Sequence, residues 1–463
     1  MNGYLHFIEI NTSYFFEYNE FTLTVYSNNS RTLTEQAKQL YNTVTTEKKY
    51  AIGSNIEESI NYIFFINQYP FENKLFKALQ GKETINVAYY IELNAYISNF
   101  SINRINFSSP ELDYIFCVNS RIEKHVDVDQ KTINIQTLPY NTSKERFSFC
   151  LKREKINCEF GVNTSLSFKS NTPLTLSCTL SCEMGNTTNL DTLFEICSII
   201  KSFLIFICNR KNIFYNSIKI FGIDEESNKF NLGKIHLKVE SSESSDILCE
   251  SVDIRYFKSC LSELFNLISQ QKLYLDHIPL NYQEQKNITV AREIMDFFAF
   301  ECNYKICFGD RIPSEDRLRV KSDVLSKLND IGDNYNRNEK KCLGLYKSFT
   351  RHYDFSLSEK IKFSCNVFRN ILSDINKYIY RINDKEEDTF SKISRRLEIY
   401  RNNYAHGNIN IEKGKYFISD ILLLEWLNYC MILKYCGYNE IEIYNLIVKI
   451  FRISLPEKNM QEQ

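Results

Sequence analysis

Hydrophobic residues follow two different periods along the chain, and the change of period divides it into two halves. In the first half apolar and polar residues alternate, as in Phe21, Leu23 and Val25 among threonines, a pattern typical of β-strands with one buried face. The most regular alternation is in LTLSCTLSC, which places five side chains on one face of a strand: Leu174, Leu176, Cys178, Leu180 and Cys182. Because free cysteines are often buried, we interpret these two as small core residues rather than metal ligands.

Further β-rich runs occupy the rest of the first half, at residues 85–97, 131–138 and 146–160. One long helix is expected at 190–208, and strands resume near residue 218 and continue to about 240. The polar segment SSESSD, residues 241–246, then predicts a loop between the two halves.

In the second half apolar residues recur at steps of three and four, which predicts amphipathic helices. Local signals mark several helix ends: SLSE at 356–359 has the spacing of a capping box, and Gly437 is placed to end a long helix. Pro313 and Ser314 predict the start of another helix. The expected helices span residues 257–271, 290–304, 315–331, 357–379, 388–405, 418–435 and 440–451.

Together the two periods predict an α+β fold in two parts. Residues 1–250 are expected to form a β-rich N-terminal region and residues 251–463 an all-α helical bundle. The length of 463 residues is compatible with two or three domains of roughly 150 residues each.

Composition narrows the class of protein without identifying it. The formal net charge is −1, so any contact with nucleic acid must come from a local basic patch. The first ten residues lack the features of a signal peptide, so the 15 cysteines are expected to stay reduced in a cytoplasmic protein. The apolar stretches 196–208 and 421–436 contain charged residues and are shorter than the roughly 20 residues of a membrane span, so both are expected to be buried helices.

The segment RLEIYRNNYAHGN, residues 396–408, carries the candidate chemistry. Arg401 precedes His406 by five positions, and Gly407 can end the helix just after the histidine. In a continuous helix two residues five apart point about 140° away from each other, so their side chains converge only if the helix loosens at its end. The same helix has a core-facing apolar stripe: Phe390, Ile393, Leu397, Tyr400 and Tyr404.

A histidine and an arginine suit metal-free cleavage of RNA. Histidine is the residue type that most readily gains and loses a proton near neutral pH, so His406 can take the proton from a ribose 2′-hydroxyl or protonate the departing 5′-oxygen. The Arg401 guanidinium can bind the phosphate as negative charge builds up on it. Asn402 can orient the phosphate or His406. No cofactor is expected, and the histidines show no spacing suited to a metal site.

YRNNYAHG, late in an all-α region and followed by a long helix, resembles the motif of the HEPN ribonuclease family. IMDFFAFECNYK is similar to the first HEPN helix of ApeA-like phage-defence proteins, in which an acidic residue stands at the position of Glu301. INRINFSSPELDYIF and LDTLFEICSIIKSFLIFI resemble their β-rich N-terminal region. The resemblance implies an endoribonuclease of an anti-phage, abortive-infection system, with catalytic residues Arg401, Asn402 and His406 and with Glu301 in a supporting role.

The resemblance also implies the partners. These are an RNA substrate, with tRNA as one candidate, a second copy of the chain in a homodimer or higher homo-oligomer, and a phage trigger of unknown kind sensed by the N-terminal region. No membrane contact is expected. Two other interpretations stay open: a non-catalytic HEPN-like dimerisation protein with a ligand-sensing N-terminal region, and a partner of a separate nucleotidyltransferase. His406 could also simply be a cation favoured at a helix C-terminus, and Glu301 either a buried acid paired with Arg401 or an exposed residue.

Overall fold

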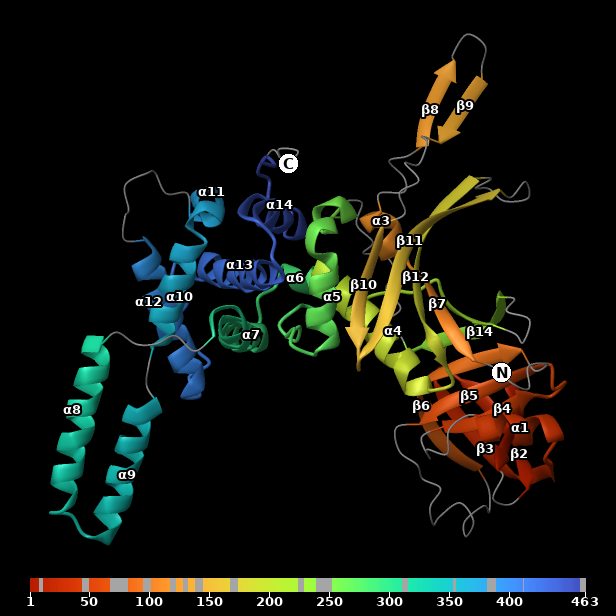
Figure 1. Cartoon of the computed structure of the whole chain (residues 1–463), viewed down its shortest axis with the longest axis horizontal. Helices are drawn as coiled ribbons and strands as arrows, with labels where there is room; N and C mark the ends of the chain where they lie inside the picture. The colour runs from red at the N-terminus through yellow and green to blue at the C-terminus, as the bar shows by residue number, and fades with distance from the viewer. Residues whose placement is uncertain are drawn as a thin grey trace. The chain divides into compact units, whose positions relative to one another are not determined.

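The computed structural model describes residues 1–7, 11–43, 50–66, 82–94, 101–116, 122–127, 132–137, 145–166, 174–223, 229–238, 252–309, 315–352, 355–380, 389–410 and 412–458. The chain forms two compact units, Met1–Gln271 with Leu280–Tyr282, and Lys272–Pro279 with Gln283–Gln463. The first contains the strands and the second is helical (Figure 1), which confirms the α+β class. The loop expected at 241–246 lies outside the described residues, and the two units separate after Gln271.

Six strands at the start of the first unit pair in a closed circuit. They are β1 (Asn2–Phe7), β2 (Thr12–Asn19), β3 (Thr22–Thr32), β4 (Tyr50–Asn55), β5 (Ile60–Ile66) and β6 (Lys82–Asn94). The first part of β6 pairs with β3 and the rest pairs with β5, which closes the circuit. Alternating side chains such as Leu23 and Val25 fill its interior, together with Phe16 and Phe64. Helix α1 (Glu35–Thr43) contacts β4.

The sheet continues from β6 through six more antiparallel strands. These are β14 (Lys229–Leu237), β13 (Ser217–Ile223), β7 (Ile102–Ser108), β12 (Leu174–Thr187), β11 (Glu154–Leu166) and β10 (Arg146–Leu151), and β8 (Ile122–Asp127) with β9 (Thr132–Thr137) forms a separate hairpin. Helices α3 (Pro110–Ile115) and α4 (Leu190–Cys208) lie beside this part. The single face expected for LTLSCTLSC is confirmed where its side chains are described, since Leu176, Cys178, Leu180 and Cys182 are buried. The sulfur of Cys182 lies 3.4 Å from that of Cys158, its cross-strand partner, without a disulfide.

Helix α5 (Leu261–Ser269) covers the end of the strand order at β10. The backbone N–H of Ser148 donates to Ser262 Oγ at 3.3 Å, and that of Cys150 donates to Asn266 Oδ1 at 2.9 Å. Phe265 packs on the aromatic side chains of the same strand. An uncovered edge strand would expose these N–H groups to other chains. Helix α5, expected in the helical half, therefore belongs to the β-rich unit.

The second unit is built around α13 (Phe417–Cys436), which is buried along most of its length and contacts helices on several sides. The other long helices are α7 (Val290–Phe308), α8 (Glu315–Gly332), α9 (Arg337–His352), α10 (Leu357–Val367), α11 (Arg369–Tyr380), α12 (Thr389–Ala405) and α14 (Glu440–Ile450). The short helix α6 (Tyr282–Gln285) precedes them, while the 3-10 turns η5 (Ile254–Tyr256) and η6 (Lys258–Cys260) belong to the first unit. Two predicted helix ends are confirmed, the capping box at Ser356 and the left-handed Gly437 after α13. Pro313 and Ser314 lie outside the described residues.

Two predictions for the helical unit are wrong. The single helix expected at 357–379 is two helices. The apolar residues keep a helical spacing throughout, but α10 ends at the buried Phe368 and α11 begins after it. No helix was expected at α9 either, a mostly polar segment with Gly344 at its centre. Helices α8 and α9 form an antiparallel hairpin that projects from the other helices of the unit (Figure 1).

Candidate functional site

The helix that carries the arginine and the histidine ends where the sequence predicts. Gly407, two residues after the last helical residue of α12, has a left-handed φ of +78°. Its N–H donates to the Tyr404 carbonyl at 3.0 Å, and the Asn408 N–H donates to the Asn403 carbonyl at 2.9 Å. These two bonds form a Schellman motif, which favours glycine because a Cβ is strained in the left-handed region. His406 is therefore held at the C-terminal cap of α12 with its side chain exposed.

Arg401, Asn402 and His406 are all exposed, but one chain does not bring the arginine and the histidine together. Arg401 Nη1 donates to Asn402 Oδ1 over a long 3.4 Å, so the amide oxygen of Asn402 faces Arg401 rather than His406. Among the described residues the His406 ring makes no hydrogen bond or ion pair. The helix stays regular up to Ala405, so the two side chains point in directions about 140° apart.

His406 shares the exposed face of α12 with Asn402 and with three residues that were not among the candidate site residues. Lys392, Arg395, Ile399, Asn402 and His406 recur at steps of three and four, and all five are exposed. The face is therefore basic at its N-terminal end, through Lys392 and Arg395, and carries the apolar Ile399 and the uncharged Asn402 before His406. This spacing is visible in the sequence and could have identified the face before the structure.

Of the two alternatives left open for Glu301, the structure agrees with the exposed residue and not with a buried acid paired with Arg401. Glu301 is half-exposed on α7 and forms an ion pair with Lys360 Nζ of α10 at 2.8 Å, so it is neither buried nor paired with Arg401. The acid of α7 that does contact the candidate segment is Glu293, which is fully buried two turns earlier on the same helix. Nothing in the spacing of the sequence distinguishes these two glutamates.

Glu293 holds the end of α12 from inside the unit. Tyr404 donates its hydroxyl hydrogen to Glu293 Oε2, and Lys413 Nζ lies 2.7 Å from Glu293 Oε1. Burial, and the neighbouring carboxylate, raise the pKa of the Tyr404 hydroxyl, which keeps it a hydrogen-bond donor. As expected from the apolar stripe, Tyr404 is a core residue. This contact fixes the helix between Arg401 and His406.

A second buried polar group lies between α7 and α13. Arg292 Nε donates to Glu425 Oε1 at 2.8 Å, and its Nη1 donates to the carbonyls of Glu284 and Gln285, both at 3.1 Å. Asp296 is fully buried one turn further along α7, and neither of its carboxyl oxygens has a partner among the described residues. Burial, followed by the nearby Glu425, raises the pKa of Asp296 well above its ordinary value although Arg292 opposes the shift. These surroundings favour the uncharged form of its carboxyl group.

Arg396 of the candidate segment has a structural role. Its Nε and Nη2 donate to the two oxygens of Asp420 on α13, each at 2.7 Å. The Tyr380 hydroxyl donates to the same carboxylate at 2.8 Å. Asp420 is fully buried, so this forked pair compensates a charge inside the unit.

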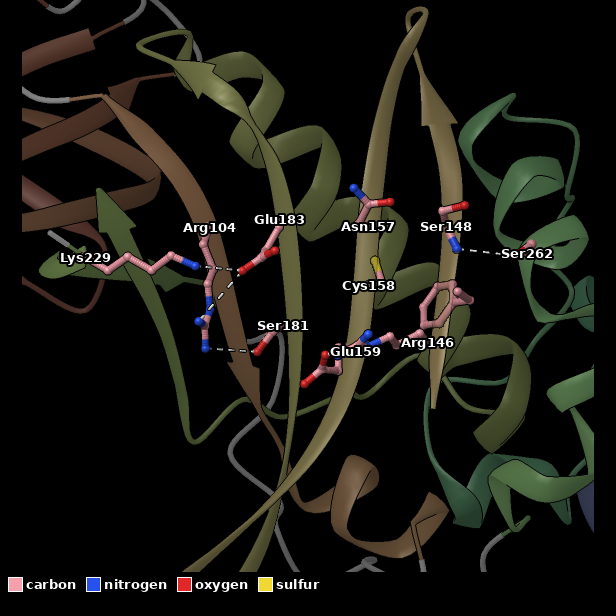
Figure 2. A pocket seen from close by; sticks show the side chains of 11 residues that line it. Arg104, Arg146, Ser148, Asn157, Cys158, Glu159, Ser181, Glu183, Lys229 and Ser262 are labelled. Carbon is pink, nitrogen blue, oxygen red and sulfur yellow. Dashed lines mark hydrogen bonds and ion pairs between the residues drawn. The ribbon is translucent and has the colours of Figure 1, made fainter. Parts of the chain in front are cut away.

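The first unit contains a polar cavity of about 860 Å³ on the outer face of the sheet (Figure 2). Its charged lining residues form two groups. Arg146 Nε lies 2.9 Å from Glu159, while Lys229 Nζ lies 3.2 Å from Glu183 with Arg104 at 4.0 Å. The remaining lining residues are Phe147, Ser148, Asn157, Cys158, Ser181 and Ser262. The site was not predicted from the sequence, because its residues come from six separate elements.

Comparison of the chain with protein-family models, curated proteins and solved structures finds no match. Within the described ranges no three histidine, cysteine, aspartate or glutamate side chains are grouped so that they could hold a metal ion. No helix among these residues is both long and apolar enough to span a bilayer.

Proposed function

We propose that the chain is a metal-independent endoribonuclease of the HEPN type that acts in anti-phage defence. The observation that carries the proposal is the end of α12, where a glycine cap presents His406 to solvent with Arg401 and Asn402 exposed nearby. An imidazole with free access to solvent and an arginine whose Nη1 makes only a long contact are the groups that this reaction needs. The basic face formed with Lys392 and Arg395 would attract a phosphate backbone.

In the proposed reaction His406 takes the proton from a ribose 2′-hydroxyl, and the 2′-oxygen attacks the adjacent phosphorus. The bond from phosphorus to the 5′-oxygen breaks, and the protonated His406 gives its proton to that oxygen as it leaves. Arg401 binds the phosphate oxygens as their negative charge grows. The products are a 2′,3′-cyclic phosphate and a 5′-hydroxyl. Because Arg401 and His406 diverge within one chain, the active site would combine side chains of two copies of the chain in a dimer.

Incubation of the purified chain with mixed RNA in excess EDTA tests this proposal. We expect cleavage to continue, with cyclic phosphate at the new 3′ ends and hydroxyl at the new 5′ ends. A His406→Ala preparation purified in parallel controls for a contaminating nuclease. Activity that EDTA abolishes and magnesium restores would contradict a mechanism centred on His406.

A second candidate is a non-catalytic protein whose helical unit dimerises while the β-rich unit binds a ligand. The polar cavity beside Arg104 and Arg146 favours it, since a binding site on the β-rich unit is what a sensor needs. Two results distinguish the candidates. The second candidate predicts that the parent chain and the His406→Ala variant are equally inactive on RNA. It also predicts that Arg104→Ala alters ligand binding.

A further inference from the structure

The α8–α9 hairpin exposes large apolar side chains that a solvated helical hairpin does not need. The exposed fractions are 57% for Val320, 41% for Val324 and 42% for Ile331 on α8. On α9 they are 72% for Leu345 and 66% for Tyr346. Contiguous exposed apolar surface of this kind usually marks an interaction site.

The exposed residues on each helix form a stripe. On α8, Val320, Val324 and Ile331 fall within about 40° of one another around the helix axis, and the exposed Lys327 lies on the same side between the last two. On α9 the stripe has the spacing i, i+3, i+4 and i+7 of an amphipathic helix: Cys342, Leu345, Tyr346 and Phe349. Neither stripe is the side on which the two helices pack together.

The packing side of the hairpin shows how the stripes are arranged. A Cβ placed on Gly332 of α8 would lie 3.1 Å from Leu343 Cδ2 of α9, so these residues face each other. Viewed from its own N-terminus, each stripe is displaced counter-clockwise from this packing side. Because the helices are antiparallel, the same displacement brings both stripes to one side of the hairpin. The two stripes thus form one apolar face, which we call the hairpin face.

We propose that the hairpin face binds the hairpin face of a second copy of this chain, forming a four-helix interface. The area is sufficient. Helix α8 has 18 residues, which corresponds to about 27 Å of length, and two adjacent helices are about 20 Å wide. Two such faces would together bury on the order of 1,000 Å², near the lower limit for a specific interface.

Charge sets the orientation of the pairing. Asp316, Asp323 and Asp330 recur every seven residues along α8, all exposed at the outer margin of the hairpin face. This acidic row would repel itself if α8 lay on the α8 of the second copy. It is compatible with α8 lying on α9, where exposed Lys341 stands one turn before Leu345. The pairing is then two-fold symmetric, with the same residues contributed by each copy.

Sedimentation velocity of the full-length chain over a concentration series tests the proposal. The parent is expected to dimerise. The double variant Val320→Glu/Leu345→Glu is expected to remain monomeric at concentrations at least tenfold above the one at which the parent dimerises. Leu318→Glu is the matched control, since Leu318 is 43% exposed on α8 but lies on the opposite side of the hairpin. A parent that is monomeric throughout, or a double variant that associates like the parent, would overturn the proposal. Thermal unfolding of each variant checks that it is folded.

Charge reversal examines the orientation. Asp323→Lys and Lys341→Glu should each weaken dimerisation several-fold, and the combined variant should recover most of the loss. No recovery would overturn the placement of α8 on α9.

Vesicles of phosphatidylserine and phosphatidylcholine test for a membrane instead. A parent chain that is monomeric and binds these vesicles would favour a membrane, provided that Val320→Glu/Leu345→Glu abolishes the binding. The measurement is mass rather than cleavage, so it does not rest on the proposed function. His406→Ala should dimerise normally even if the nuclease proposal fails.

Discussion

The two sides of helix α12 use similar side chains in opposite ways. On the inner side Arg396 forks onto the buried Asp420, and Tyr404 donates to the buried Glu293. On the outer side Arg401 makes one long contact and His406 makes none among the described residues. Arg396 and Arg401 are only five positions apart, so the difference comes from what each side chain contacts.

This difference separates groups that hold the fold from groups that are free to meet a substrate. Removing one partner of a buried pair leaves the other charge without compensation, at a cost of several kcal/mol. Removing an exposed side chain with no partner costs little stability. The inner side of α12 should therefore control unfolding, and the outer side should control activity. Four experiments, each built on one or more substitutions, can break or sharpen this contrast.

The largest effect is expected on catalysis from the outer side. His406→Ala and Arg401→Ala should each lower RNA cleavage by roughly 100- to 10,000-fold, the usual range for a lost general acid or base. Both should leave the free energy of unfolding within about 0.5 kcal/mol of the parent. Arg319→Ala, at an exposed arginine of α8, is the matched control. If His406→Ala cleaves RNA like the parent, the residue only ends a helix, and the non-catalytic candidate takes precedence.

The inner side should show the reverse pattern. Arg396→Ala strands the Asp420 carboxylate and should lower the free energy of unfolding by roughly 3 kcal/mol, and Leu397→Ala by roughly 2–5 kcal/mol through the cavity it leaves. Cleavage by the folded fraction should remain. Arg395→Ala, at the exposed neighbouring position, should be near neutral for stability. Urea unfolding followed by the fluorescence of Trp426, the single tryptophan, reports on the helical unit. Equal stability of Arg395→Ala and Arg396→Ala would remove the contrast.

A smaller effect is expected from the pH dependence of Asp296. Its pKa in the folded state is raised, so the folded state keeps a proton that the unfolded chain loses above about pH 4. This group's contribution to stability is complete below that pH and decreases as pH rises towards the folded pKa. Asp296→Asn cannot titrate, so between pH 5 and pH 8 it should lose less stability than the parent. Urea midpoints at the two pH values measure this, and parallel losses in the two proteins would contradict it.

The smallest effect is expected from Glu301, despite its place in the sequence resemblance. Because Glu301 forms only a half-exposed pair with Lys360, Glu301→Gln should change the free energy of unfolding by less than about 1 kcal/mol. Cleavage should change by less than about threefold. Glu293→Gln is the informative comparison, since it weakens the contact that fixes Tyr404 and should reduce both stability and activity. A larger loss of cleavage from Glu301→Gln than from Glu293→Gln would restore the supporting role.

The periodic parts of the fold were predictable, while the long-range partners were not. The alternation around Cys178 and the stripe through Leu397 each identified a buried face, and Gly407 marked a helix end, because these signals depend on neighbours within one element. Helix α9 was not predicted, because its apolar stripe faces solvent and Gly344 interrupts an otherwise polar segment.

The candidate site divides in the same way. Its position on α12 and its exposure follow from local pattern, so the sequence could locate Arg401 and His406. The choice between Glu293 and Glu301 depends on which side of α7 packs against α12. No local pattern in the sequence indicates that side. The cavity beside Arg104 could not be predicted either, since strand order brings its residues together.

The side chains of Ser262 and Asn266 that cover β10 have a consequence for how the protein is made. A ribosome releases the strands of the β-rich unit well before α5, so the nascent sheet carries an open edge until residues 261–269 emerge. During that interval β10 can pair with another nascent chain, and slower translation beyond residue 260 would lengthen the exposure. An expression fragment that stops at residue 250 would keep the edge open permanently and should aggregate, whereas one that continues to residue 282 includes its cover.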